Sequence, residues 1–166
     1  MSTAVAVLAP PATPPSCLEF YRAVFGGPLF TATAVLEEAD VVAVAPAGCC
    51  APGVAPRLRA AAGRGCRILA VGPAVASLAA TGLLDGHRVA VREEQALAFA
   101  RRFPRVRVAP GVRFVDDDPV LTAPDHRAGL DLCLHLVRKD HGAAAAADLS
   151  AGLHPFVVPR TRTGRL

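Results

Sequence analysis

Short apolar runs alternate along this chain with segments typical of helices, and this alternation restricts the fold more than any other feature. The runs at residues 3–8, 41–45, 66–71 and 87–91 are dominated by Val, Ala, Leu and Ile. Strands that are apolar on both sides are typical of a parallel sheet whose two faces are covered by helices. The 166 residues are 52% hydrophobic, which is enough to fill one such core. We therefore predict an α/β fold.

The remaining elements follow from apolar spacing and from turn signals. Leu130, Cys133, Leu134 and Val137 are spaced i, i+3, i+4 and i+7, which predicts one buried face of a helix over residues 126–140. Further helices are expected at residues 16–25, 54–62, 74–80, 93–103 and 143–149, and further strands at 29–36, 106–108, 113–115 and 120–121.

The positive charge of the chain is concentrated at its C-terminal end. The formal net charge is +4, and Arg160, Arg162 and Arg165 lie within the last seven residues. We predict one domain over residues 1–159, followed by a basic tail over residues 160–166. Such a tail suits either contact with phosphate groups or an ordinary solvated end.

Composition excludes several classes of protein. The absence of Trp and the single Tyr argue against an aromatic platform for single-stranded nucleic acid. No apolar run approaches the roughly 18 residues of a membrane span, and the N-terminus has no basic segment typical of a secretory signal. The five cysteines are odd in number and lack zinc-site spacing. We expect a cytoplasmic protein with reduced thiols, no metal, no cofactor and no membrane contact.

Four short sequence segments, taken in their order along the chain, resemble one known family. They are residues 82–88 (GLLDGHR), 98–104 (AFARRFP), 128–137 (AGLDLCLHLV) and 140–142 (DHG). They resemble the ThiJ/PfpI (class I glutamine amidotransferase-like) superfamily, and within it the sensor-like domain that precedes the DNA-binding domain of AraC-type regulators. The resemblance implies a flavodoxin-like three-layer sandwich, with a mostly parallel sheet and helices on both faces, that forms homodimers.

The family's chemistry depends on a cysteine at a sharp turn between a strand and a helix, where the helix N-terminus lowers the thiol pKa. The resemblance places Gly72 at that cysteine position, Arg92 at the family's histidine and Thr13 at its acidic residue. Together, these departures imply that thiolate chemistry is lost at the usual place.

Residues that follow the apolar runs are the candidates for a binding site, because ligands of open α/β sheets bind beyond the carboxyl ends of the strands. The resemblance places Pro46, Ala47 and Gly48 in a loop beside the turn at Gly72. The ligand-binding candidates are Gly48, Cys49, Gly72, Pro73, Arg92 and His126; the catalytic candidates are Arg92, Asp125, His126, Cys49 and Cys50.

Each candidate has a simpler alternative. Cys49 and Cys50 can be plain loop thiols. Arg92 can pair with Glu93 or Glu94 at the surface. Asp125 is a good helix N-cap residue.

Two further sets of ionisable residues, outside the candidate site, have structural rather than functional interpretations. We expect His135 to pair with Asp131 one helical turn away. We expect Asp116, Asp117 and Asp118 to form a solvated turn rather than a cation site.

Two functions from different classes fit these residues. The first is a non-catalytic, dimerising, sensor-like domain that binds a small molecule. Direct contact with nucleic acid is not expected, because the seven residues after Pro159 are too few for helix-turn-helix motifs. The second is a cofactor-independent enzyme of specialised metabolism, of the lyase, hydratase, isomerase or cyclase type. In it Asp125 or His126 moves protons, Arg92 holds an anionic oxygen, and Cys49 or Cys50 is a displaced nucleophile.

Overall fold

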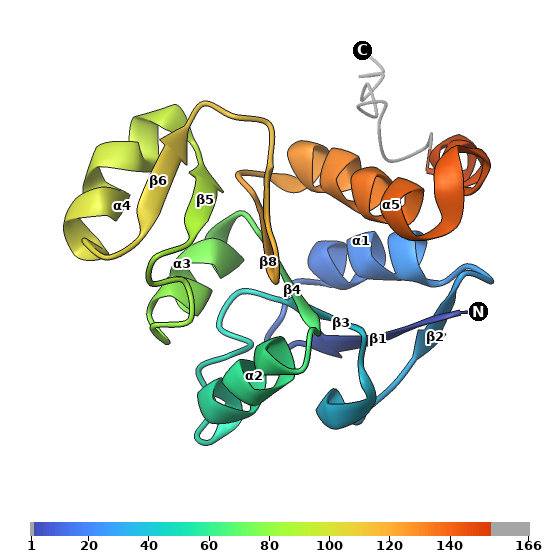
Figure 1. Cartoon of the computed structure of the whole chain (residues 1–166), viewed down its shortest axis with the longest axis horizontal. Coiled ribbons are helices and arrows are strands. Elements are labelled where there is room, and N and C mark those ends of the chain that lie inside the picture. The colour runs from blue at the N-terminus through green and yellow to red at the C-terminus, as the bar shows by residue number, and fades with distance from the viewer. Residues whose placement is uncertain (1, 154–166) are drawn as a thin grey trace, which may run out of the picture.

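The computed structural model describes residues 2–153, and the basic tail predicted at residues 160–166 lies outside them. A six-stranded sheet, ordered β2-β1-β3-β4-β8-β7, forms the centre, and β5 and β6 form a second, two-stranded sheet (Figure 1). All the paired strands are parallel except β7, which runs antiparallel to β8. The strands are β1 (Thr3–Leu8), β2 (Phe30–Ala32), β3 (Val41–Val44), β4 (Arg67–Val71), β5 (Arg88–Val91), β6 (Arg107–Pro110), β7 (Val115–Asp117) and β8 (Val120–Ala123).

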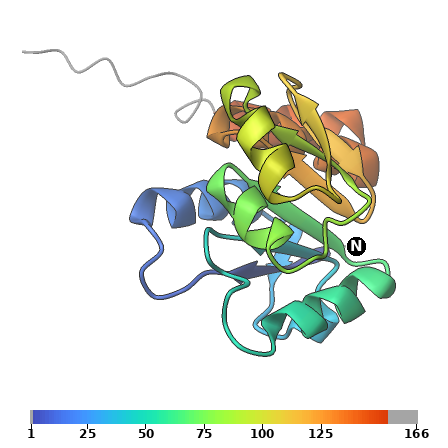
Figure 2. The same ribbon diagram turned by 90° about the vertical axis from the view of Figure 1, so that its left-hand side faces the viewer.

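Helices cover both faces of the main sheet, which confirms the predicted three-layer sandwich. Helices α1 and α5 lie on one face and α2 and α3 on the other. In the turned view, α3 and α4 lie one above the other, at the end of the molecule where β5 and β6 are found (Figure 2). The helices are α1 (Pro15–Phe25), α2 (Val54–Gly63), α3 (Pro73–Ala79), α4 (Ala96–Arg102) and α5 (His126–Gly152), with short 3-10 helices at η1 (Leu36–Glu38) and η2 (Glu93–Gln95).

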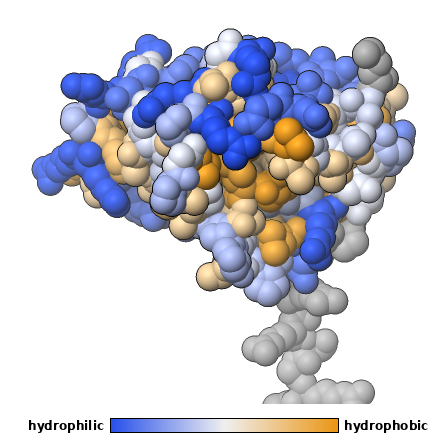
Figure 3. All heavy atoms as spheres, turned by 90° about the horizontal axis from the view of Figure 1, so that it is seen from below, coloured by the Kyte–Doolittle hydropathy of each residue, from blue (hydrophilic) through white to orange (hydrophobic). Residues whose placement is uncertain are grey.

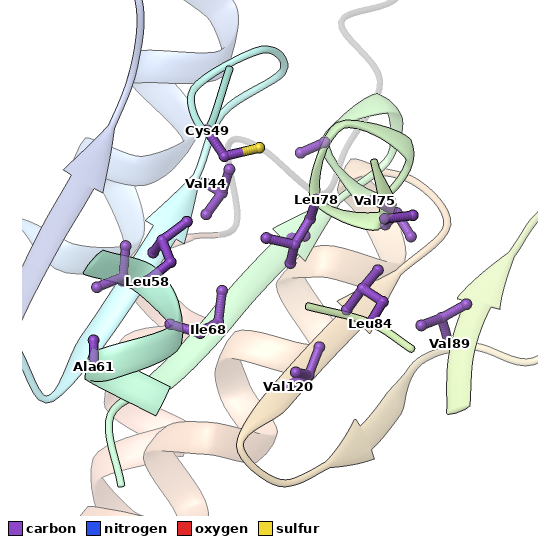
Figure 4. Packing of buried hydrophobic residues seen from close by; sticks show 14 of the residues in the cluster. Val44, Cys49, Leu58, Ala61, Ile68, Val75, Leu78, Leu84, Val89 and Val120 are labelled. Carbon is purple, nitrogen blue, oxygen red and sulfur yellow. The ribbon is translucent and has the colours of Figure 1, made fainter. Parts of the chain in front are cut away.

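The apolar runs supply both halves of the core because successive side chains of a strand point to opposite faces. In β3, Val42 and Val44 pack with α2 and α3, whereas Val41 and Ala43 pack with α1 and α5. All four residues are fully buried, as expected for a central strand covered on both sides. Figure 4 shows the first of these clusters, with Leu58 of α2 and Leu78 of α3 directed at the strands.

Helix α5 packs closely on the sheet through Gly129. A Cβ atom added there would lie 2.9 Å from the side chain of Val71, too close for any other residue without a shift. The helix bends at Gly142, whose φ of 90° and ψ of 172° are not helical, so the two helices predicted on either side of residue 142 are both present.

Three sequence predictions outside the site are wrong in detail. The strand expected over residues 29–36 is only Phe30–Ala32, because the chain then turns into η1. Asp118 lies in the exposed turn predicted for residues 116–118, but Asp116 and Asp117 belong to β7 and are half-buried. His135 contacts Asp116 at 2.8 Å, not Asp131, because β7 runs beside α5 and offers its carboxylate there.

The face of the molecule seen in Figure 3 carries hydrophilic side chains along its outer parts and hydrophobic residues gathered near its centre. The large hydrophobic residues exposed among residues 2–153 are Val7, Val35 and Leu97, each on a different segment. No helix within this part of the chain has the length and apolar character required to cross a membrane.

Candidate functional site

The carboxyl ends of β4, β5 and β8 surround a hollow in the described part of the chain. Gly72 follows β4, Arg92 follows β5, and Pro124 follows β8. These turns and the facing side of α4 enclose a pocket of about 560 Å³, a size suited to a small molecule. Five sequence candidates line it, as expected from their positions after strands: Gly72, Pro73, Arg92, Asp125 and His126.

Gly72 occupies the sharp turn between β4 and α3. Its φ of 59° and ψ of −126° lie in a region that residues with a side chain rarely adopt. The Gly72 amide donates a hydrogen bond of 2.9 Å to the carbonyl of Ala123, which ties the turn to the end of β8. A Cβ atom at this position would meet only the Pro124 carbonyl oxygen, at 3.8 Å. The turn therefore has space for a side chain but carries only hydrogen.

The loop after β3 lies outside this pocket, contrary to what we expected of Gly48, Cys49 and Cys50. A Cβ atom at Gly48 would lie 2.1 Å from the Leu8 carbonyl oxygen, so glycine is required there by the close approach of the loop to β1. The Ala47 amide donates to the Ser77 hydroxyl at 3.0 Å, which fixes the loop to α3.

Cys49 is a core residue, with only 3% of its surface exposed. Figure 4 shows it beside Val44, with its sulfur directed toward the helix that carries Leu78. Burial, together with the neighbouring Cys50, raises the pKa of the Cys49 thiol to about 11. A thiol with this pKa is almost entirely protonated at neutral pH, which argues against a displaced nucleophile at Cys49. Cys50 is exposed on the outer side of the loop.

Arg92 is exposed at the rim of the pocket, immediately after β5. Within residues 2–153 it makes no ion pair, so the predicted alternative of a pair with Glu93 or Glu94 is wrong. The reason is geometric, because Glu93 and Glu94 turn into η2 and Glu93 lies against Gly111 instead. Arg92 therefore lines the pocket without an ion-pair partner among the described residues.

Asp125 and His126 form the wall at the start of α5. The Asp125 carboxylate accepts a hydrogen bond of 2.9 Å from the Ala128 amide, which confirms its predicted role as N-cap. His126 is exposed, and its ring packs edge-on against Phe20 of α1 at a centroid distance of 5.2 Å. Both residues line the pocket, but one oxygen of Asp125 is already committed to the helix.

The position that the resemblance matched to the family's acid lies away from these groups. Thr13 is buried, and its hydroxyl donates a hydrogen bond of 2.7 Å to the carbonyl of Pro10. It holds the loop between β1 and α1 and does not line the pocket.

Helix α4 and the residues on either side of it supply pocket residues that the sequence analysis missed. Gln95 at the end of η2, Phe99 and Arg102 of α4, and Phe103 directly after it all line the cavity. Phe99 and Phe103 are four residues apart, and their ring centroids lie 4.9 Å from each other. The spacing of these two aromatic residues could have indicated an apolar face on this helix. It could not have shown that this face borders the pocket after β4.

A wider groove of about 950 Å³ lies at the opposite, amino ends of the strands. Arg67 and Asp140 form an ion pair within it, and the Arg64 guanidinium donates a hydrogen bond to the Glu37 carbonyl. Across residues 2–153 no group of three or more His, Cys, Asp or Glu side chains could hold a metal ion.

Comparison with known proteins agrees with this arrangement. No protein-family model matches the chain. A ThiJ/PfpI family protein from Pseudomonas syringae superposes with a TM-score of 0.76 at 17% identity, covering 99% of this chain and 80% of that one. The chain has the ThiJ/PfpI fold. The same ThiJ/PfpI fold is found in an AraC family transcriptional regulator from Pseudomonas putida, with a TM-score of 0.71, 19% identity and coverage of 90% and 97%.

Sequence similarity points to one group of proteins with this ThiJ/PfpI fold. The HTH-type transcriptional regulator ArgR of Pseudomonas aeruginosa is 39% identical over 113 residues, which are 68% of this chain and 33% of ArgR. The chain thus spans about a third of the length of this curated relative. Its relatives by sequence are regulators of this kind.

Proposed function

We propose that this chain is a sensor-like domain that binds a small molecule in the pocket between Gly72, Arg92 and His126, without thiol chemistry. The observation that carries the proposal is the turn at Gly72. The five cysteines all lie within the described residues, and none of them lines the pocket. None of the described residues that line the pocket supplies a sulfur nucleophile.

The sequence relatives support a regulatory role for such binding. ArgR is named as a transcriptional regulator, and this chain matches a third of its length. Ligand binding at the strand ends would then report to another part of a regulator or to a partner chain. We propose that this domain acts as a homodimer, in accord with the family resemblance.

Catalysis of the acid–base type is the second candidate, because Arg92 and His126 line one pocket. An arginine can hold a developing anionic oxygen while a histidine moves a proton. Asp125 is a weaker candidate for proton transfer, because its carboxylate already caps α5.

A pocket-blocking variant tests the proposed function. Thermal unfolding is followed with a defined set of small carboxylates, amines, sugars and nucleotides. Ala98 lines the pocket, so Ala98→Trp should abolish the stabilisation that any of them gives. Leu97, 65% exposed on the same helix, gives the matched control Leu97→Trp, which should retain it.

Two outcomes contradict the proposal. One is the absence of pocket-dependent stabilisation by every compound class. The other is turnover of any compound that collapses in Arg92→Ala or His126→Ala, which would establish the enzyme instead.

A further inference from the structure

The pocket beside Gly72 has an excess of positive charge. Arg92 and Arg102 both line it, and within residues 2–153 neither makes an ion pair. Of the described lining residues Asp125 is the one acid, and its carboxylate is engaged by the Ala128 amide. Two arginines and one aspartate thus line the cavity, which leaves an excess of one positive charge among these side chains.

The walls between these charges are apolar. Phe99 and Phe103 present their rings from α4, and Val75 faces them from α3. The guanidinium carbon of Arg102 lies 5.1 Å from the centroid of the Phe103 ring, a stacked arrangement that holds the charge at the pocket wall. The cavity therefore combines a surface for an apolar body with fixed donors for an anionic group.

Resting on the proposed function, we propose that the ligand is a small organic carboxylate with an apolar body and no ammonium group. The carboxylate is bound by Arg92 and Arg102, whose planar donor forks match its two oxygens. The apolar body packs against Phe99, Phe103 and Val75. An ammonium group is disfavoured because two arginines and a single acid, Asp125, line the pocket.

Affinity for a matched probe series tests this assignment by calorimetry on the intact chain. The probes are 3-phenylpropionate, 4-methylpentanoate, the neutral 3-phenylpropionamide and the cationic 3-phenylpropylamine. We expect the carboxylates to bind at least about tenfold more tightly than the amide, since hydrogen bonds to a charged group are the stronger ones. The amine should not bind.

Three variants locate the effect. Arg92→Met and Arg102→Met keep an unbranched aliphatic stem and remove the charge, so each should weaken 3-phenylpropionate binding about tenfold. Arg101→Met is the control, because Arg101 is also exposed on α4 but does not line the pocket. It should leave the affinity unchanged, and all three variants should unfold at the temperature of the unmodified chain.

The outcomes separate this inference from the proposed function. Equal binding of amide and carboxylate, blocked by Ala98→Trp, overturns the carboxylate assignment and leaves the sensor function in place. The same conclusion follows if neither carboxylate binds while other compounds occupy the pocket. Absence of pocket-dependent binding by every compound overturns both.

Discussion

The hydroxyl of Thr122 in β8 accepts a hydrogen bond of 2.9 Å from the backbone amide of Ala90 in β5. Both residues are fully buried. This bond joins the two-stranded sheet to the main sheet, where no strand pairing does so. Arg92 follows Ala90 by two residues, so the position of one pocket wall depends on this contact.

Replacing Thr122 should loosen that wall. Thr122→Val keeps the shape of the side chain but leaves the Ala90 amide buried without a partner, which costs about 1–3 kcal/mol of unfolding free energy. Thr122→Ser keeps the hydroxyl and should lose less than the valine variant. Chemical denaturation measures both, and equal stability of the two variants would mean that the bond contributes nothing.

The turn at Gly72 gives the second prediction. Gly72→Ala should destabilise the chain by about 1–3 kcal/mol, because alanine is strained at a φ of 59° and a ψ of −126° even though space is available. Gly63→Ala is the matched control, since Gly63 ends α2 without a positive φ and a Cβ there meets nothing within 4 Å. A neutral effect of Gly72→Ala would show that the turn is not strained.

Thiol accessibility gives the third prediction. Iodoacetamide near pH 8 should label the exposed Cys50 well before the buried Cys49, whose pKa of about 11 leaves about one thiolate in a thousand molecules. Peptide mass spectrometry distinguishes the sites after digestion. Faster labelling of Cys49 than of the buried Cys66 would indicate an activated thiol and would favour the enzyme.

Asp116 provides a pH-dependent contribution to stability. Burial tends to raise the pKa of its carboxyl, but the hydrogen bonds from His135 and Lys139 outweigh this effect and lower it. A carboxyl with a lower pKa in the folded chain stabilises the fold above its unfolded value of about 3.9, and this stabilisation is lost as the pH falls through the folded value.

Asp116→Asn should therefore reduce the unfolding free energy by about 1 kcal/mol at pH 7, and the difference should diminish as the pH falls from the unfolded value toward the lower folded value and below it. Asp131→Asn is the control, because its partner Arg113 is 73% exposed and such pairs contribute little. Denaturation at several pH values provides the measurement. A deficit that stays constant as the pH falls would show that ionisation of Asp116 is not its source.

Oligomeric state is the fifth prediction. Sedimentation equilibrium at micromolar concentration should give twice the 17.1 kDa mass of one chain. A clean monomer over the whole concentration range would remove the homodimer from the proposed function.

Much of the fold could be predicted from the sequence because it depends on local order. A continuous apolar run such as residues 41–45 is typical of a strand that is buried on both faces. Several such runs therefore predicted a parallel sheet covered by helices on both sides. Asp125 was predicted as a helix cap from its residue type and its place before an apolar period. The break at Gly72 was visible because glycine and proline end a buried strand.

Tertiary contacts alone decided which side chains meet. Cys49 looked like a pocket thiol in a loop, but the loop folds onto β1 and places its sulfur in the core. His135 contacts Asp116 on β7 rather than Asp131, which lies one helical turn away in α5. Arg102 and Phe103 line the pocket because α4, which packs on β6, lies across the cavity from the turns that follow β4 and β5. Sequence spacing constrains neighbours within one element, whereas the packing of separate elements depends on the summed burial of many side chains that no short pattern encodes.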